Sequence, residues 1–542
     1  MFKCKQLLRR ICVVSYVFLL CGGLVNASNL VSKTNTLIGT QGNGWASGYL
    51  YPGATYPFGM VQFTPTYFTK QLGFVINQLS GAGCDHMGNF PTLPIAGALR
   101  VSPDSILNMQ TPVGKEIGTA GYYAATVDHS IRAELTVTER TGMARYTFSS
   151  KEKQGTVIIG GGVAATSIQV AAIKITGPHS CEGYAEGGAF CGIPTPYKVY
   201  FVAEFDADAE SFGTWKEERL HANHTFAEGS HSGVYFTFPL KEGNQAVQYK
   251  IGVSYVSVEN ARENLRVENP AWDFSAVRQA TQDKWNEYLG KIEVEGDNED
   301  RQMQFYTHLY RSLIHPNVCS DVNGEYMGAD SQVHKIARKF YTSFSNWDTY
   351  RTQTALIAML APEETSDIVM SHYLFAEQSG GGFPRWVLAN IETGVMQGDP
   401  TPILVANAYA FGARNYDPRT LLRTMRYGAE VPGANSQGVL TRPGLEQYLE
   451  KGYYDASILL EYTSSDFAIG RFALQACNDE PVCNWYTQRA MNWKNLFNKE
   501  TGWLQSRNGD GSWKRYDADW RESTYKNYFW MVPYDIAGLI EI

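Results

Sequence analysis

The chain has 542 residues, more than one typical domain holds, and 44% of them are apolar, which excludes a disordered or low-complexity protein. Its 46 basic and 54 acidic residues give a net charge of −8, which argues against a nucleic-acid partner. Charged residues make up only 18% and aromatic residues 13%, a composition that suits carbohydrate binding because sugar rings stack on aromatic side chains.

Residues 1–27 have the layout of a secretory signal peptide. Basic residues precede an apolar stretch from Ile11 to Leu24, and Val25–Ala27 supplies a small-residue cleavage site. One alternative is a membrane anchor, but the stretch is shorter than the roughly 20 residues that a span needs. Another is a lipoprotein site at Cys21, which bulky Leu20 fits poorly. No later segment is apolar enough to cross a bilayer, so we expect an exported protein, periplasmic or extracellular.

Residues 28–265 show the period-two alternation of half-buried strands. Apolar and polar side chains alternate in the runs 131–137, 144–148, 199–205 and 249–255. Clusters of Gly, Asp and Asn separate these runs, as turns do. The pattern predicts an N-terminal antiparallel β-sandwich over 28–265.

From Phe274 onward, apolar positions recur every three to four residues, as in amphipathic helices. Helices are expected at 274–290, at 303–313, from Pro362 to Gly380 and at 486–497. We therefore expect a helical linker over 266–298 and a helical domain over 299–542. The fold class is α+β with two domains.

Six of the nine cysteines lie beyond the predicted signal peptide. Cys181/Cys191 and Cys477/Cys483 are close enough in sequence to pair in loops, and export permits this, whereas Cys84 and Cys319 have no obvious partner. The chain lacks the two-pair CxxC spacing of a zinc site.

Several loop segments combine acids and arginines with aromatic rings. They are Tyr51–Met60, Leu79–Cys84, Asp321–Asp330, Trp347–Arg351, Phe383–Trp386, Met396–Asp399 and Tyr528–Asp535. A sugar site needs rings to stack on, and carboxylates and guanidinium groups to hold hydroxyls. The Asp321 segment has the composition of a calcium loop but lacks the Gly and Glu spacing of an EF-hand, so we predict a turn there.

These blocks, in this order from about Leu37 to Leu539, resemble glycoside hydrolase family 92, the calcium-dependent exo-acting α-mannosidases. The runs 52–60 and 344–351 carry the resemblance in combination. It implies an N-terminal β-sandwich, a helical linker and an (α/α)6 barrel, with the active site at the domain interface. It also implies inverting hydrolysis of terminal α-mannosides, of the α-1,2 type, from mannose-containing oligosaccharides or N-glycans. Ca2+ is the implied cofactor.

By this resemblance the general acid is Glu522, which precedes the segment Tyr528-Phe-Trp-Met-Val-Pro-Tyr-Asp535. An alcohol is a poor leaving group, so its departure needs a proton donor. Tyr525, Tyr528 and Trp530 would raise the pKa of Glu522 if their cluster excludes water. The alternative is a structural Glu that is hydrogen-bonded to a tyrosine.

The resemblance also implies a set of sugar contacts. Asp348 matches the family's sugar-contacting position, and Arg351 orients it from the same Trp347–Arg351 segment. Arg385 and Trp386 would supply a hydroxyl contact and a stacking face, and Cys84 would lie near the pocket. The alternatives are a buried Asp–Arg pair at a helix start, interdomain packing for Arg385 and Trp386, and a small buried hydrophobe for Cys84.

The sequence departs from the family pattern at three places near the pocket. They are Ser523–Asn527 after the acid, Asn407 where Asp is expected, and Val75–Gln78 in place of a His-rich stretch. The family's Asn-Glu-Pro calcium block and paired base aspartates are also expected beyond residue 542. We therefore expect a truncated chain with an incomplete barrel that lacks its general base and its main calcium ligands.

Two other classes of protein compete with a mannosidase. A degenerate or truncated glycan-binding relative fits the three departures, but it does not explain why Glu522 and Asp348 are retained. Another (α/α)6 enzyme, such as a trehalase-like hydrolase or a phosphorylase, is an analogy of fold alone and would need its own acid/base pair.

Overall fold

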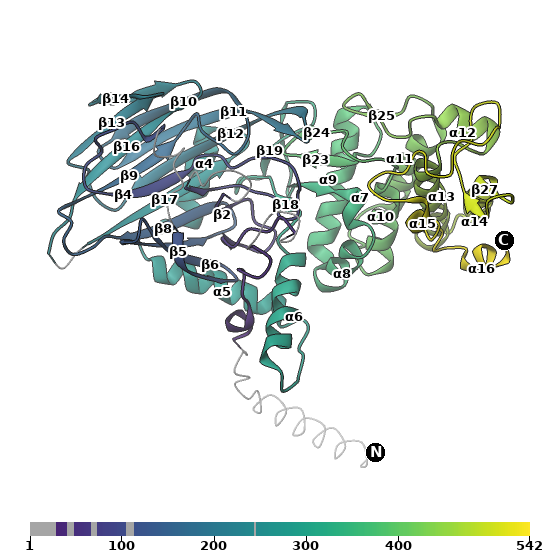
Figure 1. Ribbon diagram of the computed structural model, residues 1–542, viewed down its shortest axis with the longest axis horizontal. Coiled ribbons are helices and arrows are strands. Elements are labelled where there is room, and N and C mark those ends of the chain that lie inside the picture. The colour runs from purple at the N-terminus through teal and green to yellow at the C-terminus, as the bar shows by residue number, and fades with distance from the viewer. Residues whose placement is uncertain (1–28, 41–47, 67–72, 105–112, 243–244) are drawn as a thin grey trace, which may run out of the picture.

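The structure, a computed structural model, describes residues 29–40, 48–66, 73–104, 113–242 and 245–542. The predicted signal peptide, residues 1–27, lies outside them. The described chain forms a β-sandwich followed by a helical domain, with the linking helices along one side of the sandwich (Figure 1). Within these ranges, no helix is long and apolar enough to cross a membrane.

Two antiparallel sheets face each other in the N-terminal half. The first has eight strands in the order β1 (Ala54–Thr55), β2 (Gln62–Pro65), β3 (Phe74–Val75), β4 (Thr92–Ala96), β9 (Gln154–Gly160), β16 (Ser232–Pro239), β13 (Ser211–Lys216) and β14 (Arg219–Ala222). The second has nine strands in the order β15 (Phe226–Glu228), β10 (Ile168–Gly177), β11 (Ser180–Phe190), β12 (Ile193–Phe205), β17 (Ala246–Ser254), β8 (Thr141–Thr147), β7 (Ile131–Val137), β6 (Tyr122–Val127) and β5 (Val113–Thr119).

The four predicted strand runs are confirmed as parts of β7, β8, β12 and β17. In β7 every other side chain from Ile131 is fully buried, so the alternation in sequence faces one side of the strand toward the core. Inward-facing side chains of both sheets form one hydrophobic core, and Trp386 and Leu388 of the helical half join it. The two halves therefore share buried surface.

The helices follow the sandwich in chain order. They are α4 (Val258–Glu268), α5 (Phe274–Leu289), α6 (Glu299–Ser312), α7 (Asn346–Thr349), α8 (Gln353–Leu360), α9 (Pro362–Ser379), α10 (Thr401–Ala410), α11 (Pro418–Glu430), α12 (Leu445–Lys451), α13 (Ala456–Cys477), α14 (Glu480–Ala490), α15 (Tyr525–Tyr528) and α16 (Ile536–Glu541). Two 3-10 helices are η1 (Leu30–Lys33) and η2 (Met491–Leu496).

Short strands lie in the loops between these helices. They are β18 (Asn317–Val318), β19 (Glu325–Met327), β20 (Val333–Lys335), β21 (Tyr341–Thr342), β22 (Phe344–Ser345), β23 (Trp386–Leu388), β24 (Ile391–Glu392), β25 (Asn435–Ser436), β26 (Val439–Leu440), β27 (Phe497–Asn498) and β28 (Trp503–Leu504).

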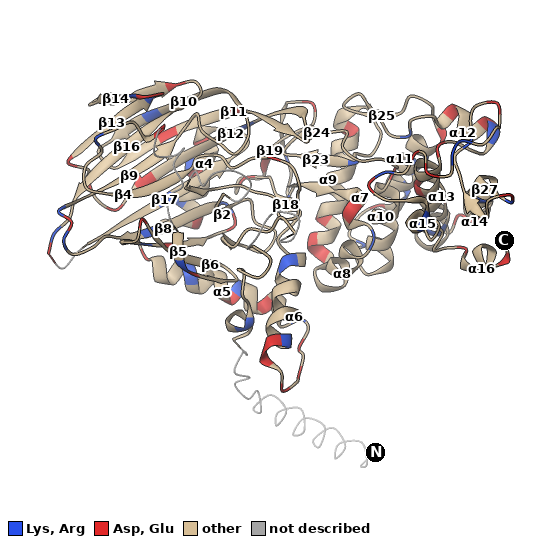
Figure 2. Cartoon of the chain, viewed as in Figure 1, with Lys and Arg blue, Asp and Glu red and all other residues tan. Residues whose placement is uncertain are grey.

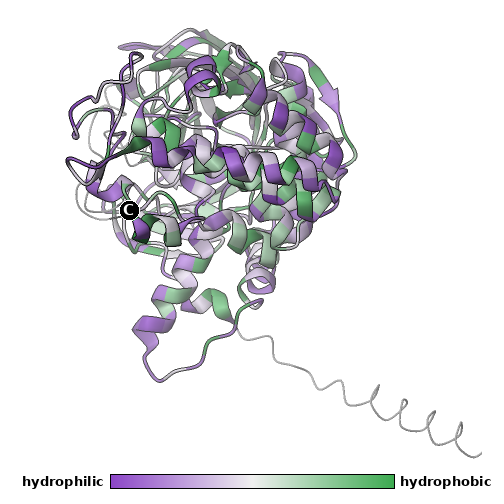
Figure 3. Cartoon of the chain, turned by 90° about the vertical axis from the view of Figure 1, so that its right-hand side faces the viewer, coloured by the Kyte–Doolittle hydropathy of each residue, from purple (hydrophilic) through white to green (hydrophobic). Residues whose placement is uncertain are grey.

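The helix boundaries follow from local chemistry. The Asp273 carboxylate accepts a hydrogen bond from the Ala276 amide at the start of α5. Helix α9 begins with Pro362 and ends at Gly380, whose φ of 119° only glycine adopts without strain. Seen from the helical end, single helices carry both hydrophobic and hydrophilic residues (Figure 3). The four predicted helices are confirmed, the last as α14 followed by η2.

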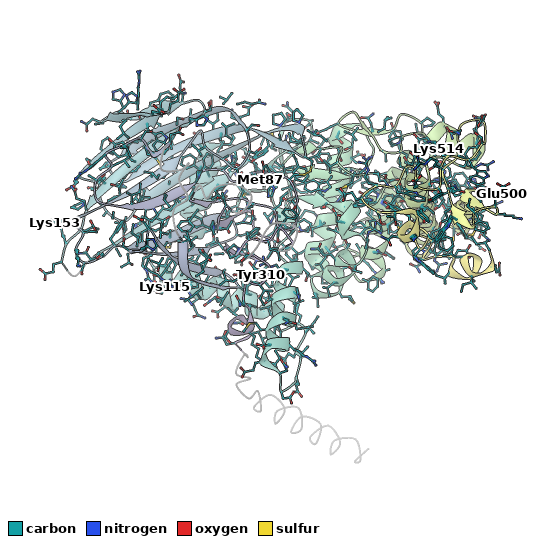
Figure 4. The ribbon with its side chains drawn as sticks, viewed as in Figure 1. Met87, Lys115, Lys153, Tyr310, Glu500 and Lys514 are labelled. Carbon is teal, nitrogen blue, oxygen red and sulfur yellow. A yellow bond between two sulfur atoms is a disulfide. The ribbon has the colours of Figure 1, made fainter. Side chains whose placement is uncertain are left out.

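Linker helices fasten the two halves together. Trp285 of α5 is fully buried, and its indole N–H donates to the Thr55 carbonyl oxygen of the sandwich at 2.7 Å. Tyr310 of α6, labelled in Figure 4, is hydrogen-bonded to the Thr55 hydroxyl at 2.8 Å. This packing fixes the edge of the sandwich against the start of the helical domain.

Candidate active site

A cleft of about 460 Å³ in the helical domain contains Glu522 in its wall. Asp455, Asp517 and Asp519 also line it, and each pairs with a cation. Lys514, labelled in Figure 4, bridges Asp455 at 2.7 Å and Asp519 at 2.9 Å. Asp517 is paired with its neighbour Arg515, and Figure 2 shows acidic and basic residues interspersed in this part of the chain. Among the described residues, Glu522 is the cleft carboxylate that takes part in no ion pair.

Glu522 has a left-handed backbone, with φ of 52°, which is uncommon for a residue with a Cβ. Its loop is held by Tyr528, whose hydroxyl donates to the carbonyl oxygen of Arg521 at 3.1 Å. The Gln397 amide donates to the Tyr528 hydroxyl at 3.2 Å, and the Ser457 hydroxyl donates to the other end of the same amide at 3.2 Å. A chain of hydrogen bonds thus runs from α13 to the residue before Glu522.

The expected dry aromatic cluster around Glu522 is not what the structure has. Glu522 is exposed, and Trp530 is 67% exposed. Tyr528 alone of the three expected rings is buried, and it bonds to backbone rather than to Glu522. Tyr525 is half-buried against Trp503 and Tyr516 instead, and water reaches the Glu522 carboxylate.

The Trp347–Arg351 segment spans the short helix α7 and the turn after it. Asp348 is exposed and accepts a hydrogen bond from the Ser345 hydroxyl. Desolvation by the surrounding protein raises the pKa of Asp348, against the lowering effects of the Ser345 hydroxyl, the Arg351 charge and the Trp386 indole. Arg351 makes its ion pair with Glu461, at 3.5 Å, and not with Asp348. The alternative of a buried Asp–Arg pair is therefore wrong.

Glu461 on α13 is a residue that sequence reasoning missed. Its side chain is 0% exposed, and its carboxylate accepts hydrogen bonds from the Trp347 indole and the Tyr350 hydroxyl, both at 3.0 Å. Burial raises the pKa of Glu461 to about 7, although the Arg351 charge opposes the rise. The sequence does hold a feature that could have identified it, an acid within the apolar run Ile458-Leu-Leu-Glu-Tyr462. A buried charge needs partners, so such an acid indicates a site of specific contacts.

Glu461 also connects the two parts of the candidate site. Burial raises the pKa of Tyr528, and the charges of Glu461 and Glu522 add to the rise. Arg351 in turn has a guanidinium nitrogen 3.4 Å from the Met531 sulfur, three residues beyond Tyr528. The structure therefore connects the 347–351 segment, through Glu461 and Met531, with the 525–531 stretch that follows Glu522.

The Arg385 side chain forms its hydrogen bonds with backbone oxygens. Its guanidinium donates to the carbonyl oxygens of Gly394, Met396, Gly398 and Leu440, at 3.1 to 3.4 Å. These bonds fix the loop that carries Gln397 into the cleft wall. Arg385 is 8% exposed, so its position supports the loop rather than presenting free donors to a ligand.

Trp386 packs between the two halves of the chain. Its ring lies 4.3 Å from the Phe190 ring, centroid to centroid, at the end of β11. This is the interdomain packing given as its alternative role. The same indole contributes a hydrogen bond that lowers the pKa of Asp348, so Trp386 also touches the 345–351 segment.

Cys84 forms a disulfide with Cys191, with Cα atoms 5.2 Å apart. The suggested pairs Cys181/Cys191 and Cys477/Cys483 are wrong, because these cysteines, other than Cys191, have free thiols. Spacing failed because antiparallel folding brings residues 107 positions apart together. Cys191 follows Phe190, so the disulfide lies one residue from the ring that packs on Trp386. The structure places Cys84 at the domain junction, not beside Glu522.

Two further motifs have structural roles. The prediction of a turn at Asp321 is confirmed, with the Gly324 amide donating to the Asp321 carbonyl oxygen at 2.9 Å. The Asp321 carboxylate is buried and accepts from Ser254, Asn260 and Asn264. Asn407, at one of the three departures, donates to the Tyr350 carbonyl oxygen at 2.9 Å and so helps to hold the 347–351 segment.

Calcium has no ready-made site within the described residues, which contain no group of three or more His, Cys, Asp or Glu side chains arranged to hold a metal ion. The acids of the cleft are held by Lys514 and Arg515. The described side chains therefore supply no complete calcium site, and no step is assigned to the ion.

A β-sandwich joined to a helical domain, with an acidic and aromatic cleft, defines a carbohydrate-active class of protein. The chain belongs to glycosyl hydrolase family 92: residues 34–254 match the family's N-terminal domain, and residues 260–542 match its catalytic domain. The family assignment confirms the resemblance that the sequence blocks indicated.

Known relatives support the same fold. An uncharacterized secreted glycosidase of Arthroderma benhamiae is 24% identical over 95% of this chain and 72% of its own length. A family 92 α-mannosidase of Bacteroides thetaiotaomicron, at 24% identity and a TM-score of 0.86, covers 95% of this chain, which spans 72% of it. An inverting mannosidase of the same family and species is 26% identical, with a TM-score of 0.84 over 94% of this chain and 72% of its own.

Proposed function

We propose that this family 92 glycosidase is an exo-acting α-mannosidase that hydrolyses terminal α-mannosides of oligosaccharides or N-glycans with inversion. The observation that carries the proposal is the position of Glu522. It lines the cleft without an ion pair, and the 347–351 segment contacts Met531, in the stretch that follows Tyr528. A related structure of the family holds mannoimidazole, which supports mannose as the sugar bound.

In this proposal Glu522 protonates the glycosidic oxygen while the bond from that oxygen to the anomeric carbon breaks. Water attacks the anomeric carbon from the opposite face, and a second carboxylate about 6.5–9.5 Å from the acid takes the proton of that water. The three aspartates of the cleft are paired with cations, so no described residue is assigned as the base.

Asp348, Arg351 and Trp347 are the proposed sugar contacts. The exposed Asp348 carboxylate can accept hydrogen bonds from two sugar hydroxyls. Arg385 is proposed to support the loop that carries Gln397, and Trp386 and Cys84 the domain junction, since their groups are used in contacts within the protein. The α-1,2 preference, the calcium dependence and the periplasmic or extracellular location belong to the same proposal, and they rest on the family resemblance.

A comparison of leaving groups tests the acid. Mannobiose needs a proton donor to release its alcohol, whereas 2,4-dinitrophenyl α-mannoside releases a stable phenolate without one. We expect Glu522→Gln to slow mannobiose hydrolysis about 10²–10⁴-fold and to slow the dinitrophenyl substrate far less. Glu450→Gln on the exposed face of α12 serves as the matched control.

The same assays separate the competing functions. Rates are measured on α-1,2-, α-1,3- and α-1,6-mannobiose, with calcium and with a chelator. If Glu522→Gln slows the hydrolysis of both substrates equally, Glu522 is not the general acid. If the chain binds mannosides but releases mannose from no substrate, the protein is a glycan-binding relative and not an enzyme.

A further inference from the structure

The buried carboxylate of Glu461 makes an arrangement that the proposed mechanism does not use. Its Oε1 accepts from the Trp347 indole at 3.0 Å and from the Arg351 guanidinium at 3.5 Å, and its Oε2 accepts from the Tyr350 hydroxyl at 3.0 Å. All three donors belong to the segment that contains Asp348. Glu461 itself lies on α13, more than 100 positions along the chain.

The hydrogen bonds around Glu461 favour a charged acceptor. Indole and guanidinium groups are donors only, whereas the Tyr350 hydroxyl, which also lies 3.9 Å from the Met531 sulfur, can donate or accept. An ionised carboxylate can accept all three bonds. A protonated carboxyl would turn its O–H toward the Tyr350 hydroxyl, which then no longer donates to it, and would lose the ion pair with Arg351.

We propose that Glu461 is a positioning residue that holds the 347–351 segment in its sugar-binding arrangement when ionised and releases the segment when protonated. Because Asp348 is the proposed sugar contact, this inference rests on the proposed function. The consequence is mannoside binding that depends on pH near neutrality.

The groups around Glu461 set where it titrates. Burial raises the pKa of Glu461 to about 7, the Arg351 charge lowers it, and the Asp348 charge raises it further. From the 525–531 segment, the Tyr528 phenol faces it. From the 396–399 loop, uncharged Gly398 contacts it, with Asp399 turned to Arg442.

A histidine also touches this segment, from α9. His372 lies 3.0 Å from the Asn346 side-chain oxygen, but burial lowers the pKa of His372 to about 4. It therefore stays neutral between pH 6 and pH 8. Unlike His372, Glu461 changes its charge across that range.

The sign and size of the effect follow from the ionised fraction. With a pKa of about 7, Glu461 is about nine-tenths ionised at pH 8 and about one-tenth ionised at pH 6. A ligand that binds only the ionised form loses affinity in proportion to that fraction. Affinity should therefore fall about tenfold as the pH falls from 8 to 6.

Calorimetric titration of the full chain with methyl α-D-mannopyranoside, which has no ionisable group in this range, measures the effect. The wild type should lose about tenfold in affinity from pH 8 to pH 6. Glu461→Gln should bind at the weak, low-pH level throughout. The control Glu430→Gln removes another helical-domain carboxylate, one that pairs with Arg426, and should keep the tenfold dependence.

A measurement without ligand keeps the inference separate from the proposed function. The fluorescence of Trp347, taken as the difference between the wild type and Trp347→Phe, should change with a midpoint near pH 7. Glu461→Gln should abolish that transition. If this transition is seen but the chain binds the mannoside at no pH, the proposed substrate is wrong and the positioning role of Glu461 is kept. Absence of the transition, or a tenfold pH dependence retained in Glu461→Gln, would overturn the inference.

Discussion

Gly398→Ala is the substitution whose effect the structure defines most closely. Gly398 lies beside Glu461 in the loop that Arg385 fixes, and its φ is 77°. A Cβ there would come 2.6 Å from the Glu461 Cβ and 2.9 Å from its Cγ. Both atoms belong to a buried side chain on α13, so neither can move away at little cost.

Three contributions combine in this variant. The left-handed backbone costs a residue with a Cβ about 1–2 kcal/mol. Alanine returns about 0.5–1 kcal/mol by reducing the conformational entropy of the unfolded chain. Overpacking in a filled core costs about 1–3 kcal/mol. The expected loss in the free energy of unfolding is about 2–4 kcal/mol.

Urea denaturation, followed by circular dichroism, measures this loss against a matched control. Gly502 has a φ of 73° and open space around the Cβ position. Gly502→Ala should therefore show the backbone effect alone, about 1 kcal/mol or less. A loss in Gly398→Ala that matches the Gly502→Ala loss would refute the close packing of this loop on Glu461.

Three further perturbations test other parts of the structure. Replacing Cys84 and Cys191 by alanine should cost about 4 kcal/mol in chemical denaturation, because the disulfide closes a loop of 107 residues; an unchanged midpoint would exclude this bond. Asp466→Asn should cost about 3–5 kcal/mol in the same assay, because it leaves two buried arginines without their shared partner; a loss below 1 kcal/mol would contradict the buried network. Burial lowers the pKa of His86 and of His315 to about 4, so the folded state rejects protons that the unfolded state binds below about pH 6.5. Stability should therefore fall as the pH is lowered from 6.5 to 4, by at most about 3 kcal/mol per histidine, and urea midpoints that stay constant across this range would oppose the assignment.

The local pattern of residues was enough to predict the elements of the fold. Alternation in the run 131–137 identified a strand because one face of β7 is buried in the sandwich. Gly290 and Gly380 marked the ends of helices because a glycine at these positions stops the helical pattern. The change of period at Phe274 predicted the order of the two domains, and the family resemblance added the (α/α)6 barrel.

Long-range partners could not be read from spacing. Cys84 pairs with Cys191 because β11 and β12 form a long hairpin whose tip reaches the 84 loop, a matter of topology rather than sequence distance. Arg385 was assigned to a sugar hydroxyl, yet four carbonyl oxygens of its own domain take up its donors.

The candidate site could be predicted only in part, because some of its contacts also join residues that are distant in sequence. The 347–351 segment stood out by its composition. Glu461 is one acid in a long apolar helix, and its role is evident only from its three hydrogen-bond partners. The expected aromatic shell of Glu522 depends on the direction in which a loop turns, and the sequence does not specify that direction.

The anomeric form of the first sugar released tests the central claim most directly. The chain is incubated with an α-mannobiose, and early proton NMR spectra are recorded before mannose mutarotates. Inverting hydrolysis with Glu522 as the acid predicts β-mannose as the first product and a signal lost in Glu522→Gln. If α-mannose appears first, or if Glu522→Gln releases mannose at the wild-type rate, the proposed mechanism is contradicted.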